Sequence, residues 1–393
     1  MSKLEELIKE FCPNGVEYKK IEELCAITTG KLNANAMVEN GEYAFFTCDA
    51  KPFRIDTYAF DMEAILISGN GSQVGHINYY KGKFNAYQRT YVLYDFQFIE
   101  VKFLLYCLEN RLRKYILLKS KKGSVPYITL PMLQEFKVPL PALPVQREIV
   151  RILDSFTLYS AELTAELTAR RKQYEFYRDK LLNFNHVQYK EVALLELLCQ
   201  SITDGPHETP VFVDSGIPFI SAEAIHDTRI DFSKIRGFIS SEYNEQCNKK
   251  YKPQINDVFM VKSGSTTGKV AMVTDSREFN IWSPIAAMRT NTSLLPRYLF
   301  YILQTKDIQN QVVKYASNGS QPNLSMRKLE QFKIKVPPID VQERIVKVLD
   351  NFDAICSDLG IGLPAEIEKR QKQYEYYRDK LLTFEGKNNN GEK

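Results

Sequence analysis

Lys172-Gln-Tyr-Glu-Phe-Tyr-Arg-Asp-Lys-Leu-Leu182 returns 200 residues later as Lys372-Gln-Tyr-Glu-Tyr-Tyr-Arg-Asp-Lys-Leu-Leu382, with a single difference in eleven residues. The segments that lead into the two copies, Gln146–Asp154 and Gln342–Asp350, share the pattern Gln-x-x-Ile-Val-x-x-Leu-Asp. A repeat of this length is not chance, and internal repeats decide the architecture of a chain. Because a longer and poorly matched segment precedes each copy, the chain alternates variable and constant parts.

The first constant segment has the spacing of one long helix. Its mostly apolar seam advances in alternating steps of four and three residues, which is the heptad spacing of a helix that packs along one face. The seam consists of Phe156, Ser160, Leu163, Leu167, Arg170, Tyr174, Tyr177, Leu181 and Phe184. No proline or glycine interrupts it, so we expect a continuous helix.

The second constant segment carries four additional residues. Gln342 lies 342 − 146 = 196 residues after Gln146, whereas Tyr374 lies 374 − 174 = 200 residues after Tyr174. The additional residues fall around Gly360-Ile-Gly-Leu-Pro364. Two glycines followed by a proline predict a break here, with Pro364 at the first position of a new helix.

A long apolar seam is not stable in water. Either the two constant segments pack on each other, or each packs on its neighbouring domain. Aromatic residues recur at the same seam positions in both copies, which favours mutual packing.

The composition is that of an ordinary globular protein of two or three domains, with 393 residues, 44% apolar and 25% charged. The net charge of +4 does not by itself indicate nucleic acid, so local patches must make that case. Seven scattered cysteines without a C-x-x-C pair predict reduced thiols. The absence of a signal peptide and of a long uncharged apolar run predicts a cytoplasmic protein without a membrane span.

The two variable segments follow one plan. The first begins with a short amphipathic helix over Leu4–Phe11, continues with β-rich runs from Val16 to Ile99, and ends with a helix over Val101–Leu118. The second repeats its landmarks with other side chains: Gly71-Ser72-x-x-Gly75 returns as Gly264-Ser265-x-x-Gly268, and Gly123-Ser124-x-Pro126 returns as Gly319-Ser320-x-Pro322. The chain is therefore a tandem duplication, for which we expect approximate two-fold symmetry.

These repeated motifs and the alternation of segments make the chain similar, over nearly its full length, to the specificity subunits of type I restriction–modification systems. Asp204-Gly-Pro-His207-x-Thr-Pro210 also resembles the start of many recognition domains in that family. The first variable segment departs from this motif, with Thr29-Gly-Lys-Leu-Asn33 in its place. The two halves therefore resemble different recognition subclasses.

The resemblance implies an α+β fold. Two similar α/β target-recognition domains would be separated by two long helices packed as an antiparallel coiled coil, in a pseudo-two-fold tandem repeat. The expected segments are recognition domains over residues 1–143 and 185–338, helical spacers over 144–184 and 339–384, and a disordered tail over 385–393.

The resemblance also implies a function. Each recognition domain would bind one half of a split, asymmetric double-stranded DNA target. The helices would dock two adenine-N6 methyltransferase subunits, and restriction subunits would join through that complex. The chain itself is then expected to be non-catalytic and to hold neither a metal nor a cofactor, since S-adenosylmethionine, ATP and magnesium would belong to the partners.

Local chemistry supplies candidates for DNA contact, because phosphates attract cations and base edges require polar side chains. Arg111–Ser124 contains six basic residues and no acid, and the matching Lys314–Asn323 is rich in amides that can pair with adenine. A solvated helix face followed by an ordinary loop has the same composition, so that alternative stays open. The candidates are Lys51, Arg54, Ser72, Gln73, Lys119, Lys121, Lys122, Ser124, His207, Lys262, Ser265, Thr266, Lys269, Asn318, Ser320, Gln321 and Asn323.

The repeated helix motif supplies candidates for subunit contact, because it retains charges that a buried seam does not need. Solvated charge is the plain alternative. The candidates are Tyr174, Tyr177, Arg178, Lys180, Tyr374, Tyr377, Arg378 and Lys380.

No catalytic motif is complete. Gly264-Ser-Thr-Thr-Gly-Lys269 is one residue short of a phosphate-binding loop, and Val270 stands where the metal-binding hydroxyl should be. The four histidines (His76, His186, His207 and His226) lack metal spacing, and His207 is expected to pack in its turn. The aromatic-ended Asn-Pro-Pro or Asp-Pro-Pro tetrapeptide of amino-methyltransferases is absent, which argues against an enzyme.

The other alternative is a protein–protein scaffold built on a coiled coil. Near-identical helices beside divergent globular surfaces instead favour a protein that reads two unlike half-sites.

Two near-identical tetrapeptides, Ser160-Ala-Glu-Leu163 and Thr164-Ala-Glu-Leu167, stand one after the other in the first helix. Each adds about 6 Å of helix. If this helix separates the domains, its length is expected to set the number of unread base pairs between the half-sites.

Overall fold

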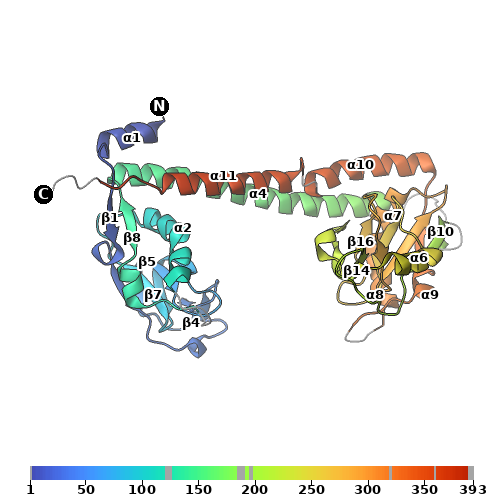
Figure 1. Cartoon of the computed structure of the whole chain (residues 1–393), viewed down its shortest axis with the longest axis horizontal. Coiled ribbons are helices and arrows are strands. Elements are labelled where there is room, and N and C mark those ends of the chain that lie inside the picture. Colours follow the sequence, from blue (N-terminus) through green and yellow to red (C-terminus); the bar gives the residue numbers. More distant parts are fainter. Residues whose placement is uncertain are drawn as a thin grey trace. The chain divides into compact units, whose positions relative to one another are not determined.

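The computed structural model describes residues 2–119, 126–183, 191–193, 198–317, 321–357 and 360–387. Contacts divide the chain into two compact units. The first contains Met1–Glu162 together with Glu368–Lys393, and the second contains Leu163–Ile367. Each unit holds one globular domain and parts of the constant helices, whose labels are given in Figure 1.

The first unit begins with helix α1 (Lys3–Phe11). Ser2 and Glu5 form a capping box at its start, in which the Ser2 hydroxyl accepts from the Glu5 N–H at 3.3 Å and the Ser2 N–H donates to the Glu5 carboxylate at 2.8 Å. The remaining elements of this domain are β1 (Glu17–Lys20), β2 (Ala26–Thr29), β3 (Tyr43–Phe46), β4 (Phe53–Ile55), β5 (Phe60–Ser68), β6 (Ile77–Ala86), β7 (Thr90–Tyr94), α2 (Val101–Lys119), α3 (Leu130–Gln134) and β8 (Lys137–Leu140). The two helices and the β-rich region predicted from sequence are confirmed.

The second unit has a corresponding but longer series of elements. Its elements are β9 (Glu191–Ala193), β10 (Cys199–Asp204), β11 (Ile217–Ile220), β12 (Ile225–His226), β13 (Arg229–Ile230), β14 (Gly237–Ile239), α6 (Ser241–Lys250), β15 (Val258–Val261), β16 (Val270–Met272), β17 (Asn280–Ile281), β18 (Ile285–Thr290), α7 (Pro296–Leu303), α8 (Lys306–Tyr315), α9 (Met326–Leu329) and β19 (Lys333–Lys335).

The two domains share one strand order. The first has β2-β7-β5-β6-β3-β4, and the second has β10-β18-β15-β16 and β17-β11-β14, which together give the same succession. In the first domain β6 pairs antiparallel with β5 and, at its end, parallel with β3. In the second domain two strands take these roles, since β16 pairs antiparallel with β15 and β17 pairs parallel with β11. Asn85 and Asn280 each turn Oδ1 onto the following backbone N–H at 3.0 Å. The predicted duplication is therefore confirmed in the topology.

The constant segments form three helices, α4 (Leu143–Leu182), α10 (Ile339–Ser357) and α11 (Leu363–Leu381). Helix α4 is continuous over 40 residues, as predicted up to Leu182, while Phe184 lies outside the described residues. The second segment breaks between Ser357 and Leu363, with Pro364 in the first turn of α11. The break predicted from the two glycines and the proline is confirmed.

In the first unit, α4 packs antiparallel to α11. The ring of Phe156 stacks on Tyr377 with centroids 5.6 Å apart, and the guanidinium of Arg370 lies 5.1 Å from the ring centre of Tyr159. Because the residue number rises along α4 as it falls along α11, the two helices run in opposite directions. The expected packing of the two copies on each other is confirmed here.

In the second unit, α4 packs on α10, where Tyr177 stacks on Phe352 at 5.8 Å. Tyr174, three residues earlier, instead meets Tyr301 of the globular domain at 6.5 Å and is 9% exposed. This end of the seam thus combines the two arrangements that the sequence allows, since it contacts both the other copy and the neighbouring domain.

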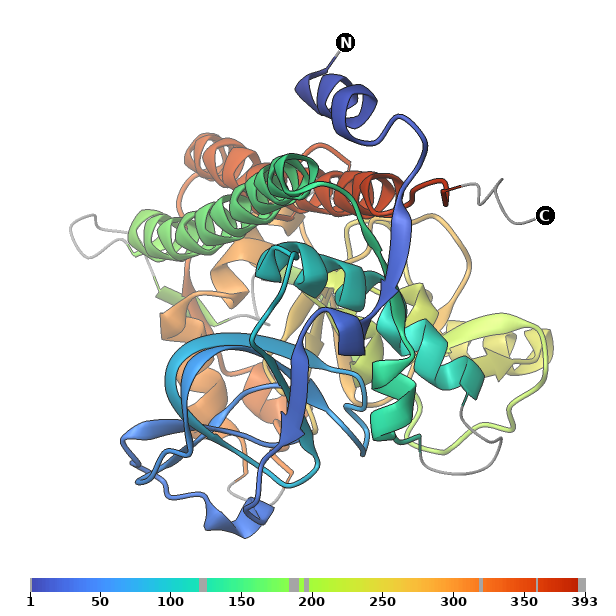
Figure 2. The ribbon, with the colours of Figure 1, turned by 90° about the vertical axis from the view of Figure 1, so that its left-hand side faces the viewer.

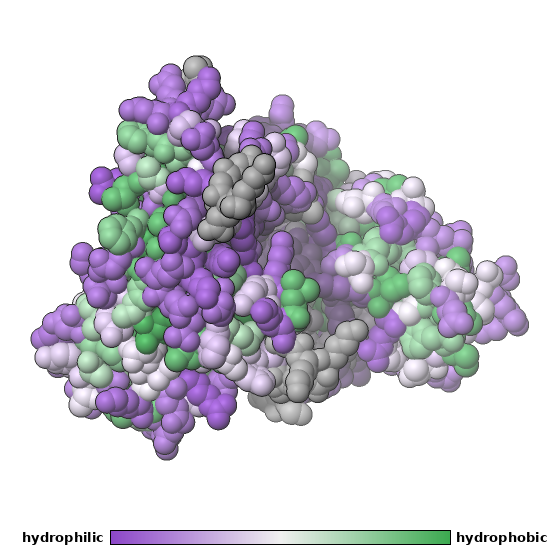
Figure 3. Space-filling view, turned by 60° about the vertical axis from the view of Figure 1, so that its left-hand side comes forward, coloured by the Kyte–Doolittle hydropathy of each residue, from purple (hydrophilic) through white to green (hydrophobic). Residues whose placement is uncertain are grey.

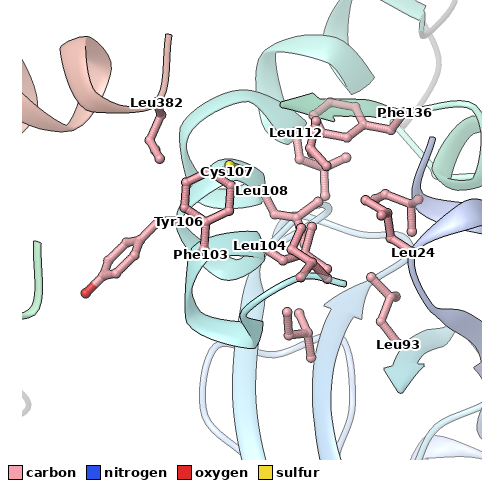
Figure 4. Close-up of a cluster of buried hydrophobic side chains, with 14 of the residues drawn as sticks. Leu24, Leu93, Phe103, Leu104, Tyr106, Cys107, Leu108, Leu112, Phe136 and Leu382 are labelled. Carbon is pink, nitrogen blue, oxygen red and sulfur yellow. The ribbon is translucent and has the colours of Figure 1, made fainter. Parts of the chain in front are cut away.

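Helix α2 carries much of the core of the first unit. Phe103, Leu108 and Leu382 are each fully buried in one cluster, although Leu382 follows the last helix of the chain. Figure 4 shows Leu382 facing the side chains of α2, whereas Tyr106 directs its hydroxyl away from the cluster. Burial raises the pKa of the Cys107 thiol to about 12, so this cysteine stays neutral and packs as a small apolar residue.

A buried glutamine fixes each constant helix to its own domain. Gln146 is fully buried, and its Nε2 donates to the carbonyls of Pro141 at 2.7 Å and Phe98 at 3.2 Å, while Oε1 accepts from the Glu100 N–H at 2.7 Å. Gln342 makes the same three bonds to the second domain, at 2.8, 3.0 and 2.9 Å. Buried amides require such partners, which explains the first residue of the repeated motif.

The aspartate that ends this motif binds a tyrosine of the same domain. Asp154 accepts from the Tyr106 hydroxyl at 2.6 Å, and Asp350 accepts from Tyr301 at 2.5 Å. Each aspartate also pairs with one basic side chain at 2.6 Å. Burial, with the aspartate adding to it, raises the pKa of both tyrosines, so the hydroxyls remain donors at neutral pH.

We expect Gln342→Leu to loosen the second unit alone. The substitution removes the hydrogen bonds that Gln342 makes to three backbone groups, and a buried group that loses its partner costs about 1–3 kcal/mol. Hydrogen exchange of the full chain should show faster exchange in residues 293–303 and unchanged exchange in residues 98–108. Gln146→Leu is the matched control and should give the reverse pattern, while equal loosening of both units by either variant would contradict this role of the glutamines.

The two ends of the chain meet in the first unit. Val16 and Gly386 form a parallel bridge, in which the Val16 N–H donates to Glu385 O at 2.8 Å and the Lys387 N–H donates to Val16 O at 3.2 Å. Figure 2 shows the last described residues beside β1. Residues 385–387 are held by backbone bonds, so the prediction of a tail disordered from residue 385 is wrong for these three positions; residues 388–393 lie outside the described part.

Candidate DNA-recognition surfaces

In the first domain, two loops at the ends of strands lie against each other. His76 Nε2 lies 3.1 Å from Ala50 O, and the Cys48 thiol donates to Asn70 Oδ1 at 3.0 Å. The exposed candidates Lys51, Ser72 and Gln73 stand on these two loops. The structure therefore brings together candidates from segments about twenty residues apart in sequence.

Tyr127 joins the same group. It forms a bridge with Asn70 and is 55% exposed, so a large amphipathic side chain stands beside the polar loop. Sequence reasoning did not select Tyr127 or Asn70. Their counterparts in the duplication, Asn323 and Ser263, form the equivalent bridge, and because Asn323 was a candidate, aligning the two halves would have indicated Tyr127.

Arg54 and Lys119 make local contacts. The Arg54 guanidinium donates to the carbonyls of Gly41 at 2.9 Å and Glu42 at 2.7 Å, which fixes the turn before β3. Lys119 Nζ lies 5.3 Å from the ring centre of Tyr115 at the end of α2. Lys121, Lys122 and Ser124 come after that helix and lie outside the described residues.

The second domain has the equivalent loop after β15. The Gly264 N–H donates to Pro322 O at 3.0 Å, and Thr267 Oγ donates to Gly264 O at 2.7 Å and Pro322 O at 3.2 Å. Gly264 has φ +99° and Gly71 has φ +84°, a left-handed conformation that glycine adopts without strain. A Cβ at either position would meet no atom within 4 Å, so both turns face open space.

Most candidates in the second domain surround this loop. Ser265, Lys269 and Gln321 are exposed, and Thr266 is half-buried. Asn323 takes part in the bridge to Ser263. Asn318 and Ser320 lie outside the described residues.

Lys262 is buried and paired. Its side chain is 9% exposed, and its Nζ lies 3.3 Å from Asp204 Oδ2. Asp204 also contacts His207 Nε2 at 3.1 Å and Lys250 Nζ at 2.7 Å. His207, expected to pack in its turn, is instead 71% exposed at its side chain and held by this carboxylate.

The same backbone positions carry other residues in the first domain. The Gly69 N–H donates to Arg89 O at 2.9 Å, as the Lys262 N–H donates to Pro284 O at 2.8 Å. A Cβ at Gly69 would lie 2.4 Å from Arg89 O, so the first domain has no room for a lysine there. Equivalent positions of one fold thus present different chemistry in the two domains.

The repeated helix motif divides into buried and exposed residues. Tyr174 and Arg178 are buried, Tyr374 and Arg378 are half-buried, and Tyr177 and Tyr377 are each 37% exposed. Lys180 and Lys380 are exposed as well. This division separates the candidates that hold the fold together from those that a partner could reach.

Two further aromatic residues of the motif, which sequence reasoning did not select, are more exposed than any of these tyrosines. Phe176 and Tyr376 are 61% and 62% exposed at equivalent positions. Figure 3 shows that the visible surface is largely hydrophilic with separate hydrophobic patches. Exposed aromatic rings at one position of a repeated motif are therefore candidates for contact with a partner.

Over the described residues, the acidic, histidine and cysteine side chains do not form a group of three or more that could hold a metal ion. No helix in the described part is long and apolar enough to cross a bilayer.

Two segments, residues 13–170 and 212–369, match the sequence model of the type I restriction modification DNA specificity domain. A type I restriction enzyme specificity subunit of Escherichia coli is 35% identical over 260 residues, which are 63% of this chain and 63% of that subunit. A putative type I restriction enzyme specificity subunit of Haemophilus influenzae is 28% identical over 389 residues, which are 94% of this chain and 96% of that protein.

Solved structures have the same fold. A chain from a structure of the assembly and conformational transition of the type I restriction–modification system aligns with a TM-score of 0.62 at 16% identity, over 94% of this chain and 98% of that chain. The type I restriction–modification S subunit of M. genitalium aligns with a TM-score of 0.52 at 17% identity, over 93% of this chain and 95% of that chain.

Proposed function

We propose, since this chain belongs to the family of type I restriction–modification DNA specificity subunits, that each of its globular domains binds one half of a split and asymmetric double-stranded DNA target. The family supplies specificity and is itself non-catalytic. The methyl transfer and the cleavage would then be carried out by other subunits, which this chain directs to their site.

The observation that carries the proposal is one fold with unlike surfaces. The two domains share the strand order, the glycine loops and the hydrogen bond from the backbone to the Asn85 or Asn280 side chain. At equivalent loop positions, however, the first domain has Gly69 and the second has Lys262. A symmetric scaffold does not need two different surfaces, whereas a reader of two different half-sites does.

The cations and amides beside the loops suit DNA. Lys51 and Lys269 are exposed next to polar side chains, so phosphates would meet the cations and base edges would meet Ser72, Gln73 or Asn323. Lys119, Lys121, Lys122 and the other candidates named from the sequence remain part of this proposal.

The repeated helices would dock the partners. Two near-identical motifs would hold two adenine-N6 methyltransferase subunits, and ATP-dependent restriction subunits would join through them. S-adenosylmethionine would be bound by the methyltransferases, and ATP with magnesium by the restriction subunits.

The test is an exchange of residues 185–338 for the corresponding segment of a relative with another target. Sequencing of methylated adenines in cells that express the chimera with its methyltransferase should show one half-site changed and the other retained. The unchanged parent is the control. A change in both halves, or in neither, would refute separate reading by the two domains.

A further inference from the structure

The buried carboxylate of Asp204 has more cationic partners than its own charge requires. Lys250 Nζ lies 2.7 Å from Oδ1, while Lys262 Nζ and His207 Nε2 lie 3.3 and 3.1 Å from Oδ2. Burial opposes ionisation of Asp204, but the hydrogen bond from Lys250 and the charges of Lys250 and Lys262 lower its pKa below the ordinary value. One negative charge therefore holds two lysines, and the cluster keeps a net positive charge at neutral pH.

The cluster is assembled from three separate elements. Asp204 ends β10, Lys250 ends α6, and Lys262 comes directly after β15. Gly205 allows the backbone after β10 to pass close to β17, because a Cβ at this position would lie 2.0 Å from Ile281 O. The tertiary fold, rather than local sequence, brings these cations to one place.

Two of the three side chains that contact Asp204 reach solvent. The side chains of His207 and Lys250 are 71% and 53% exposed, whereas Asp204 and Lys262 are 8% and 9% exposed. Lys262 leads directly into the 263–268 loop, which carries the candidates Ser265 and Thr266. The buried pair thus supports an exposed pair beside the proposed recognition loop.

We propose that Lys250 and His207, with the buried Lys262 beneath them, form a binding site for a DNA backbone phosphate in the second domain. Asp204 is the positioning residue that holds these side chains in place. This inference rests on the proposed function. Thr29 precedes Gly30 where Asp204 precedes Gly205, and Gly69 stands where Lys262 does, so the first domain lacks the site. Phosphate contacts fix the register of a protein on DNA, so the site would orient the second domain on its half-site.

Asp204→Asn separates positioning from bulk charge. The variant loses one negative charge, so the net charge of the protein rises by one. Simple attraction between charges would then predict equal or tighter DNA binding. If Asp204 positions the cations, the variant instead binds its target duplex about tenfold more weakly. The slope of log affinity against log salt also becomes shallower by about one, because one phosphate contact is lost.

Three further variants complete the test. Lys250→Gln removes an exposed cation without leaving a buried charge unpaired, and should also lower affinity and reduce the slope by about one. Lys249→Gln is the matched control, since Lys249 is the exposed neighbour of Lys250 on α6 and is not part of the cluster. Asp204→Thr with Lys262→Gly copies the first domain, removes both buried charges together, and should lose the contact while remaining folded.

The measurement is fluorescence anisotropy of the complex with its methyltransferase, titrated with a duplex that carries the motif found by sequencing host methylated adenines. Loss of affinity and slope in Asp204→Asn and Lys250→Gln, with Lys249→Gln within about twofold of the parent, supports the proposal. Parental affinity and slope in Asp204→Asn and Lys250→Gln overturn it and leave Asp204 as a purely structural partner. If Asp204→Asn does not fold, Lys250→Gln decides the question. Failure of the proposed function would look different, because the parent complex would not distinguish the motif duplex from a scrambled one.

Discussion

Insertion of a third Thr-Ala-Glu-Leu tetrapeptide after Leu167 is expected to lengthen the unread gap between the two half-sites by one or two base pairs. The two existing copies lie within α4, which is continuous from Leu143 to Leu182. Four residues add about 6 Å to a helix, and DNA rises about 3.4 Å per base pair along a strand. The letters of both half-sites should stay unchanged, because no side chain moves relative to its own domain.

The insertion also rotates the downstream part of α4 by about 40°, since four residues exceed one turn of 3.6. The helix pair must absorb this as a stutter in its seam, and the twist of DNA can take up part of the mismatch. Variants with one, two and three tetrapeptides, with sequencing of the methylated adenines of each, measure the gap. An unchanged gap in active variants, or altered half-site letters, would leave the repeat as plain helix.

Replacement of both Phe176 and Tyr376 by serine is expected to abolish stable docking of the methyltransferase. Each ring is more than 60% exposed, and both stand at the same position of the repeated motif. Aromatic residues at the centre of an interface commonly contribute at least 2 kcal/mol each, which is about thirtyfold in affinity. Neither ring belongs to the buried clusters of the chain, so the fold should persist.

The single variants make this test quantitative. Native mass spectrometry should show two methyltransferase chains on the parent, one on Phe176→Ser or Tyr376→Ser, and none on the double variant at micromolar concentration. Leu158→Ser is the matched control, because Leu158 is 62% exposed on the same helix but lies outside the repeated motif. If Leu158→Ser loses a methyltransferase as readily, or the double variant keeps both, the exposed aromatic pair is not the docking site.

The helices and their break could be predicted because their determinants are local. The seam of α4 and the two glycines before Pro364 lie within a few turns of the structure that they decide. The strand order was not predicted, because it depends on contacts such as Phe46 with Ala86 that join residues far apart in sequence. The sequence repeat still indicated that the two domains share one fold, although it did not indicate the strand order of that fold.

The candidate site was predicted unevenly for a related reason. Exposed loop residues such as Ser72 and Ser265 are expected from glycine-rich turns, and the structure places those glycines at open positions. Lys262 was selected as a candidate for DNA contact, but the fold buries it against Asp204. Lys250 was missed because nothing in its own helix indicates that the end of α6 reaches β10. The sequence shows which charged side chains are present, and only the tertiary fold shows which of them form ion pairs.

The closure of the first unit by the end of the chain has a consequence for its synthesis on the ribosome. Leu382 is fully buried in the first core, and the Arg111 guanidinium donates to its carbonyl at 2.7 Å. From Glu162 to Leu382 the ribosome must add 382 − 162 = 220 residues, which takes about 10–45 seconds at 5–20 residues per second. The second unit is continuous in sequence and can be completed within that time. The first-made domain is therefore the last to be finished, and until then its unpaired face on α4 is open to chaperones or to the wrong partner.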